Sequence, residues 1–148
     1  GGCLIFTGIL IWISKDYDGK KQIDDFQFSN ALVVGFFQGL AILPGVSRSG
    51  STIAISKILG MNPVKAARLS FLLFIPAIMG ATLLKIGEIN ETVEEVGFLA
   101  LGLGFLSSAI TSYFAVSALL ELIKQQKFHY FTPYCIVLGV FLIYSSLF

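Results

Sequence analysis

The sequence predicts an all-α integral membrane protein, built from transmembrane helices and one re-entrant helical hairpin. Hydrophobic residues make up 55% of the 148 residues and charged residues only 13%, and the mean hydropathy is +0.84. Soluble domains carry about 25% charged residues, so these values indicate one membrane domain over residues 1–148. The net charge of +1 says nothing about nucleic-acid binding, and no basic run supports it, so we expect no nucleic-acid partner.

Apolar segments alternate with short charged or turn-forming stretches along the chain. Residues 1–14 are apolar but shorter than the ~20 residues that a span needs, so we expect the end of a truncated transmembrane helix there, with Trp12 as an interface anchor. Loops are expected where charged or turn-forming residues gather, at residues 15–25, 60–63, 85–95 and 121–130. Full transmembrane helices are predicted at residues 64–84, 96–120 and 131–148.

Residues 26–59 are apolar but broken in the middle by Pro44 and Gly45, which leaves either one broken span or a re-entrant hairpin. Lys and Arg favour the cytoplasmic side of a membrane, so the loop charges distinguish the two. A hairpin places all the basic clusters on one side, namely Lys15, Lys20 and Lys21, then Lys57, Lys65 and Arg68, then Lys124 and Lys127. It places Glu88, Glu91, Glu94 and Glu95 on the other side, with Lys85 as the exception. The charges therefore favour a hairpin with both ends in the cytoplasm.

The centre of this hairpin carries a polar stretch at residues 44–52, Pro-Gly-Val-Ser-Arg-Ser-Gly-Ser-Thr. An ionisable residue at membrane depth is expensive and usually functional. The guanidinium of Arg48 is a planar fork of donors that suits phosphate oxygens, and glycines let the backbone approach a ligand closely. If a helix starts near residues 49–52, its N-terminus adds an anion-binding group. The stretch predicts a phosphate site.

Three alternative roles fit residues 44–52 less well. Close packing of small residues between membrane helices explains the glycines and serines but leaves Arg48 unexplained. The spacing of Gly45 and Gly50 matches a P-loop, but Ser51 stands where that loop has lysine and no strand precedes it. A cysteine-dependent phosphatase loop needs a cysteine that the stretch lacks.

The remaining polar residues are expected to have mainly structural or interfacial roles. Gln38 lies in the first half of the hairpin, where it either reaches the site or packs structurally. His129 is expected to be interfacial, and Glu121 to lie on a solvated face. The hydroxyls of Ser107, Ser108, Thr111 and Ser112 are expected to bond between helices. Cys3 and Cys135 have no disulfide or metal-ligand spacing.

Residues 38–52 closely resemble the undecaprenyl-diphosphate phosphatase family of the bacitracin-resistance type. Supporting matches lie at residues 66–73, followed by Pro76, and at residues 128–139. The resemblance covers nearly the whole chain. It implies a protein about twice this length with two inverted repeats, each with a re-entrant hairpin, of which this chain matches the second.

The resemblance implies hydrolysis of the terminal phosphate of undecaprenyl diphosphate at the plasma membrane by a multi-pass protein. This reaction recycles the lipid carrier for peptidoglycan synthesis and gives bacitracin resistance. Arg48 and Ser47 are the implied catalytic residues, and Gln38 matches the acidic motif of the other repeat. The implied phosphate-binding residues are Gly45, Ser47, Arg48, Ser49, Gly50 and Thr52.

The first repeat of that family supplies two glutamates, a serine pair and a histidine that have no counterpart here, so the chain alone is expected to be inactive. The resemblance also implies a divalent cation, Mg²⁺ or Ca²⁺, although no metal-ligand motif encodes one in this chain. Membrane lipids and a second copy of the chain are further expected partners. The alternative function is a membrane transporter of a lipid-linked or anionic phosphate compound, because inverted repeats and re-entrant hairpins also build transporters.

Overall fold

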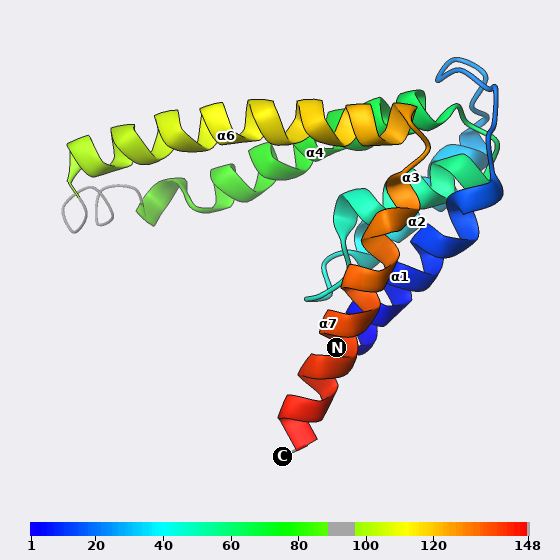
Figure 1. Ribbon diagram of the computed structural model, residues 1–148. Helices are drawn as coiled ribbons and strands as arrows, with labels where there is room; N and C mark the ends of the chain where they lie inside the picture. The colour runs from blue at the N-terminus through cyan, green and yellow to red at the C-terminus, as the bar shows by residue number, and fades with distance from the viewer. Residues whose placement is uncertain (89–96, 148) are drawn as a thin grey trace.

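The computed structural model describes residues 1–88 and 97–147, and these residues form an all-helical chain (Figure 1). Three one-turn 3₁₀ helices, η1 (Ser14–Asp16), η2 (Ile86–Glu88) and η3 (Phe128–Tyr130), punctuate the α-helices. The α-helices are α1 (Gly2–Ile13), α2 (Phe28–Leu40), α3 (Arg48–Ile58), α4 (Pro63–Leu84), α6 (Phe98–Lys124) and α7 (Phe131–Leu147). The predicted fold class is therefore confirmed as all-α.

Three helical stretches in the described residues are long and apolar enough to cross a membrane, at Pro63–Leu84, Phe98–Lys124 and Phe128–Ser146. They correspond to the three predicted spans. Asn62 fixes the start of the first, because its Oδ1 accepts hydrogen bonds from the N–H groups of Val64 and Lys65. The predicted start of the second span and most of the glutamate-rich loop, residues 89–96, lie outside the described residues.

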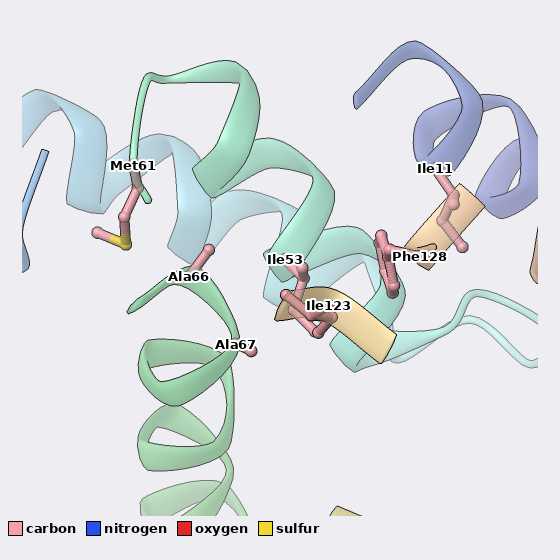
Figure 2. Packing of buried hydrophobic residues seen from close by; sticks show 7 residues of the cluster. All are labelled: Ile11, Ile53, Met61, Ala66, Ala67, Ile123 and Phe128. Atoms are coloured by element: carbon pink, nitrogen blue, oxygen red, sulfur yellow. The ribbon is translucent and has the colours of Figure 1, made fainter. Parts of the chain in front are cut away.

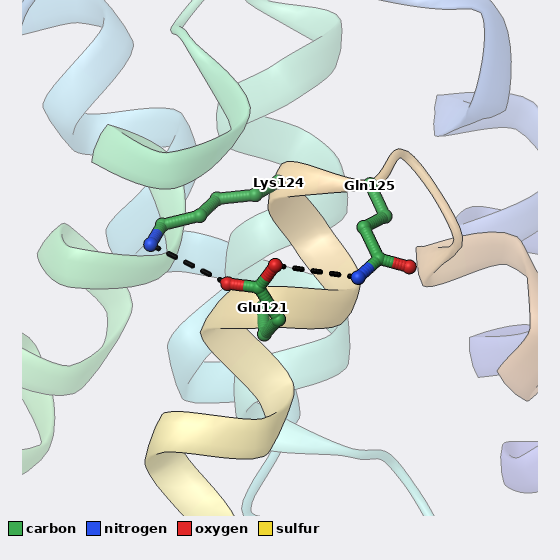
Figure 3. Close-up of polar contacts among 3 residues, drawn as sticks. All are labelled: Glu121, Lys124 and Gln125. Carbon is green, nitrogen blue, oxygen red and sulfur yellow. Dashed lines mark hydrogen bonds and ion pairs between the residues drawn. The ribbon is translucent and has the colours of Figure 1, made fainter.

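Helix α6 continues one turn past the predicted end of the second span at residue 120, to Lys124. Glu121 faces solvent there, where it pairs with Lys124 at 3.5 Å and accepts a hydrogen bond from Gln125 (Figure 3). Pairs three or four residues apart support a helix, and a basic side chain suits its C-terminal end. The charged residues thus extend the helix by one turn rather than forming a loop.

The predicted hairpin at residues 26–59 is a helical hairpin, formed by α2 and α3. Its two ends are hydrogen-bonded together, since the N–H of Lys21 donates to Gly60 O at 3.1 Å and the N–H of Asn62 donates to Lys21 O at 3.0 Å. Residues 41–47 form the turn at the other end, around Pro44 and Gly45. Neither helix reaches the length of a span, and α2 has only 13 residues.

The basic segments gather at the end where the hairpin opens (Figure 1). Besides the contacts of Lys21, the side-chain amide of Gln126 donates to a carboxylate oxygen of Asp18, and η1 contacts η3. The loop before α2, the turn after α3 and the loop after α6 therefore lie together, whereas η2 follows the far end of α4. This arrangement agrees with the charge pattern that favoured a hairpin.

Helix α3 is the centre of the molecule, although its sequence is polar. Residues 50–57 are all buried, and α3 contacts α1, α2 and α4. Figure 2 shows its Ile53 among apolar side chains from other elements, including Met61, Ala67 and Ile123. The hydroxyls of Ser51 and Thr52 donate to carbonyls one turn back in the same helix, which satisfies them inside the protein.

The remaining helices form two pairs. Helices α1 and α7 run antiparallel in close contact. Glycine at position 139 permits this approach, since a Cβ added there would lie 2.8 Å from Gly1 O and 2.7 Å from Ile5 Cγ1. Helices α4 and α6 contact each other and project away from that pair (Figure 1). The predicted interhelical bonds of the α6 hydroxyls are wrong for Ser107, Ser108 and Thr111. Each of these side chains donates to a carbonyl within α6.

Candidate functional site

The turn of the hairpin ends in a helix cap that Ser47 supplies. Its Oγ accepts a hydrogen bond from the N–H of Gly50 at 3.1 Å, so α3 begins at Arg48. Gly45 adopts a φ of +95°, a conformation that glycine takes without strain, and a Cβ added there would lie 3.1 Å from Cys3 Cβ of α1. The Ser47 cap and the backbone conformation of Gly45 therefore fix where α3 begins.

Thr7 of α1 anchors this cap, although no sequence motif marks it. The backbone N–H of Ser47 donates to Thr7 Oγ1 at 3.1 Å, and that hydroxyl donates onward to Cys3 O at 3.1 Å. Thr7 is fully buried. A Cβ at Gly50 would lie 3.1 Å from Thr7 Cγ2 and 2.8 Å from Ser47 Oγ, so only glycine fits beneath the cap. The one feature of the sequence that could have pointed to Thr7 is that it is a polar residue in an otherwise apolar helix.

Arg48 occupies the first position of α3 with its side chain half-buried. Its guanidinium lies over the ring of Phe74 on α4, with Cζ 5.0 Å from the ring centre. Among the described residues it has no ion pair and no hydrogen-bond acceptor. Five N–H donors in a half-buried position thus have no acceptor within the described part of the chain, which is costly unless water or a ligand anion accepts from them.

Arg48 lines two cavities. One, of about 300 Å³, is lined by Arg48 and Ser49 with Ser70, Phe71 and Phe74 of α4. The other, of about 410 Å³, lies between α2 and α4, and Arg48 shares it with Gln38. Arg48 therefore stands at the boundary of an open, partly apolar space.

The first turn of α3 adds further donors beside Arg48. The N–H groups of Arg48 and Ser49 have no acceptor within the helix, because the first amides of any α-helix lack one. The Ser49 hydroxyl has no hydrogen-bond partner among the described residues, and its half-buried side chain lines the same cavity as Arg48. A guanidinium, two amides and a hydroxyl can together hold an anion such as phosphate.

Thr52 lies differently from the other predicted phosphate-binding residues. Its side chain is 1% exposed, and its Oγ1 lies 2.6 Å from the hydroxyl of Ser70 on α4. This bond ties α3 to α4 one turn behind Arg48. The structure thus gives Thr52 a role in positioning the α3–α4 contact, and Gly50 is likewise buried beneath the cap.

Gln38 bridges α2 and α4 next to the site. Its side-chain amide donates to Leu73 O at 3.1 Å, close to Pro76. A proline inside a helix has no N–H to donate to the preceding turn, and Gln38 bonds to a carbonyl of that turn. Because Gln38 also lines a cavity with Arg48, both roles that the sequence left open are compatible with its position.

The predicted residues Ser47, Arg48 and Ser49 thus come together, and the structure adds Thr7, Ser70 and Phe74. Ser70 and Phe74 lie one turn apart on α4, at a spacing that places them on one face. Among the described residues there is no group of three or more His, Cys, Asp and Glu side chains that could hold a metal ion. No such side chain lines the two cavities at Arg48, and the divalent cation that the resemblance implies stays a prediction.

The fold and the site define an integral membrane protein with an arginine-marked helix N-terminus that suits an anion. The chain belongs to the family described as bacitracin resistance protein BacA, whose model matches residues 1–141. It is 42% identical to the undecaprenyl-diphosphatase of Desulfosudis oleivorans, over 94% of this chain and 51% of that relative. It is 40% identical to the undecaprenyl-diphosphatase of Alkaliphilus metalliredigens, over 99% of this chain and 54% of that relative.

The chain thus spans about half the length of these two relatives. A relative from Methanothermobacter thermautotrophicus, also named undecaprenyl-diphosphatase, is 38% identical over 99% of this chain and 83% of its own length. The expectation that family members are about twice as long as this chain therefore does not hold for that relative.

Proposed function

We propose that this chain binds the diphosphate group of undecaprenyl diphosphate and forms part of an undecaprenyl-diphosphatase of the plasma membrane. The observation that carries the proposal is the half-buried guanidinium of Arg48, which no described residue neutralises, beside the first turn of α3. The named activity of the relatives supplies the substrate. The enzyme would return the lipid carrier to peptidoglycan synthesis and remove the compound that bacitracin sequesters.

In this reaction water attacks the terminal phosphorus, the bond to the bridging oxygen breaks, and undecaprenyl phosphate and inorganic phosphate result. Negative charge shifts toward the bridging and terminal oxygens as the bond breaks. Arg48 would bind two of these oxygens in bidentate fashion, while the amides of the first turn bind a third. Contact with Phe74 limits the movement of the guanidinium, so little reorganisation is needed as charge develops.

Ser47 and Ser49 have different parts in this proposal. The Oγ of Ser47 accepts from Gly50, so its own proton remains available to a phosphate oxygen while the cap holds the turn. Ser49 offers an unengaged hydroxyl. No carboxylate or imidazole of the described residues lines either cavity. We therefore assign activation of the water to a second, repeat-related half, as the resemblance implies.

The hairpin would place this site inside the bilayer. Helix α2 has 13 residues, or roughly 20 Å at 1.5 Å per residue, which is less than the ~30 Å hydrocarbon core. An irregular turn at membrane depth is tolerated where protein or a water-filled cavity covers it, and Arg48, directly after the turn, lines two cavities. The basic clusters at the open end favour a hairpin with both ends in the cytoplasm.

We expect single cysteines introduced at Asp24 and Asn62 to react with a membrane-impermeant thiol reagent from the same side of sealed vesicles. These positions precede and follow the hairpin, whose ends are hydrogen-bonded through Lys21. The native Cys3 and Cys135 are first replaced by serine, and the variant without added cysteine is the control. Labelling of the two positions from opposite sides would exclude a re-entrant hairpin.

The transporter alternative is tested with a chimera in which residues 1–141 of this chain replace the matching residues of the Desulfosudis oleivorans relative. In detergent solution, where no second compartment exists, the chimera is expected to release phosphate from farnesyl diphosphate. The unaltered relative is the positive control. A folded chimera without phosphate release, beside an active control, would contradict the phosphatase function.

A further inference from the structure

A cavity of about 430 Å³ lies between α1 and α7, which run side by side (Figure 1), and it shares no lining residue with the two cavities of the proposed phosphate site. It is lined by Ile9 and Trp12 of α1 and by Thr132, Pro133 and Ile136 of α7. We call it the α1–α7 groove and define it by these five residues. Ile9 is 48% exposed and Trp12 is 55% exposed, so the groove opens to the outside of the helix pair.

Thr132 brings an unsatisfied hydroxyl to the wall of this groove. Its side chain is 4% exposed, and its Oγ1 is buried without a hydrogen-bond partner among the described residues. A buried hydroxyl without a partner is costly. Threonine in a helix populates two χ1 rotamers, so rotation about the Cα–Cβ bond can turn this hydroxyl toward the groove. The wall therefore has one hydrogen-bond donor that awaits an acceptor.

A positive charge stands at one end of the groove. The ammonium of Lys15 lies over the ring of Trp12, with Nζ 5.1 Å from the ring centre. Lys15 has no ion pair within the described part of the chain. It belongs to η1, which contacts η3 just before α7, so this end lies with the loops that carry the basic clusters. Tryptophan and lysine together are typical of the boundary between a bilayer and water.

We propose that the α1–α7 groove binds one glycerophospholipid with an anionic head group, from the leaflet that the basic loops face. One acyl chain lies against Ile9 and Ile136, and the ring of Trp12 covers it. The hydroxyl of Thr132 donates to the ester carbonyl that joins this chain to glycerol, and Lys15 binds the phosphate. Such a lipid has its acyl chain, ester and anionic head in the order in which the groove presents its apolar wall, hydroxyl and cation. The site goes beyond the proposed function, since it takes no part in binding the substrate.

Trp12 is the one tryptophan of the sequence, so its fluorescence reports directly on the groove. The 148-residue chain is reconstituted in phosphatidylcholine vesicles, and its fluorescence is quenched with brominated phosphatidylglycerol or brominated phosphatidylcholine. We expect the apparent binding constant of phosphatidylglycerol to be about fivefold the larger, the preference that one lysine near an anionic surface provides. Equal constants for the two lipids would overturn the proposal.

The charge at the end of the groove is tested by three variants of the same chain. Lys15→Gln is expected to abolish the preference for phosphatidylglycerol, and Lys15→Arg is expected to keep it. Lys20→Gln is the matched control, because it removes the same charge from an exposed position of the same loop. If Lys20→Gln weakened the preference as much as Lys15→Gln, the basic loops would attract anionic lipid without a site, and the proposal would be wrong.

The hydroxyl is tested with two forms of the lipid. Thr132→Val keeps the shape of the side chain and removes its donor, so we expect it to weaken binding of the diester phosphatidylglycerol about two- to tenfold. Binding of the diether form, which has no ester carbonyl, is expected to stay unchanged. Thr111→Val, at an exposed position of α6, is the control. An equal effect of Thr132→Val on both lipid forms, or no effect on either, would contradict the proposed contact and the site built on it.

A second measurement tests the groove in the chimera, where the other half is present. The chimera is reconstituted with phosphatidylglycerol that carries a diazirine in one acyl chain, irradiated, and the labelled peptides are mapped. Labelling is expected at residues 9–12 and 132–136. Ile136→Phe fills the groove and should remove the label, whereas Val137→Phe, at the neighbouring exposed position outside it, should not.

Two outcomes of the labelling would each overturn the proposal. A label spread evenly over the exposed apolar helices, and unchanged by Ile136→Phe, would mean general contact with lipid. Absence of label from residues 9–12 and 132–136 would mean that the other half of the chimera covers the groove. Phosphate release by the chimera enters neither comparison, so loss of the proposed function and loss of the lipid site are distinguishable.

Discussion

Replacement of Arg48 by lysine is expected to lower phosphate release by the chimera about 10²–10³-fold, although the positive charge is kept. Lysine is a point charge without the planar fork, so it cannot bind two phosphate oxygens in the same way. A preorganised donor of this kind contributes about 2.7–4 kcal/mol to transition-state stabilisation. In the structure, the guanidinium lies over Phe74 and has no acceptor among the described residues, which leaves its donors available to the substrate.

The kinetic constant that changes identifies the role of Arg48. A loss in kcat means that Arg48 binds charge that develops on the transferring phosphoryl group, and a rise in KM means that it only anchors the diphosphate. Arg68→Lys is the matched control, because Arg68 is the one other arginine in the sequence and is exposed on α4. If Arg48→Lys kept both constants near those of the parent, the site would be wrong, and close helix packing would account for the motif.

The purified 148-residue chain is expected to release phosphate at least about 10²-fold more slowly than the chimera that adds the other half. General acid–base groups contribute about 10²–10⁴-fold to a rate, and none lines the two cavities at Arg48 in the described residues. The measurement is phosphate release per mole of folded protein from farnesyl diphosphate. Farnesyl diphosphate binding, measured separately, confirms that the chain is folded and that its Arg48 site is formed.

The Methanothermobacter thermautotrophicus relative provides the comparison for this prediction, since this chain covers 83% of its length. Its purified form is assayed beside the chain and the chimera under the same conditions. A rate for the chain alone that equals the rate of the chimera would show that this half, as one copy or two, contains its own catalyst.

The local sequence was sufficient to predict the long helices and the turn of the hairpin. Long apolar runs predicted the three spans, and Pro44 with Gly45 predicted the bend of the hairpin, because proline and glycine act on the backbone at their own positions. Glu121 lies on a solvated face at a helix end, as predicted, and its spacing from Lys124 stabilises the last helical turn.

The centre of the fold was less accessible to sequence reasoning. Residues 50–57 of the polar helix α3 are buried, and hydropathy alone does not reveal which helix lies at the centre of the fold. In a membrane protein the outside is apolar lipid, so polar residues gain by facing other helices. The hydroxyls on α6 were predicted to bond between helices, but those of Ser107, Ser108 and Thr111 bond within α6. Serine and threonine can bond within their own helix as readily as to a neighbouring helix.

The sequence by itself determined that this is a membrane protein, that its hairpin bends at Pro44 and Gly45, and that Arg48 marks a polar stretch that suits an anion. Each of these conclusions depends on residues close together in the chain. Only the tertiary structure decided that Thr7 anchors the cap, that Phe74 orients Arg48 and that Gln38 bridges α2 and α4. These contacts join residues 26 to 40 positions apart, and helix packing fixes them through side-chain shape, which hydropathy and local spacing do not encode.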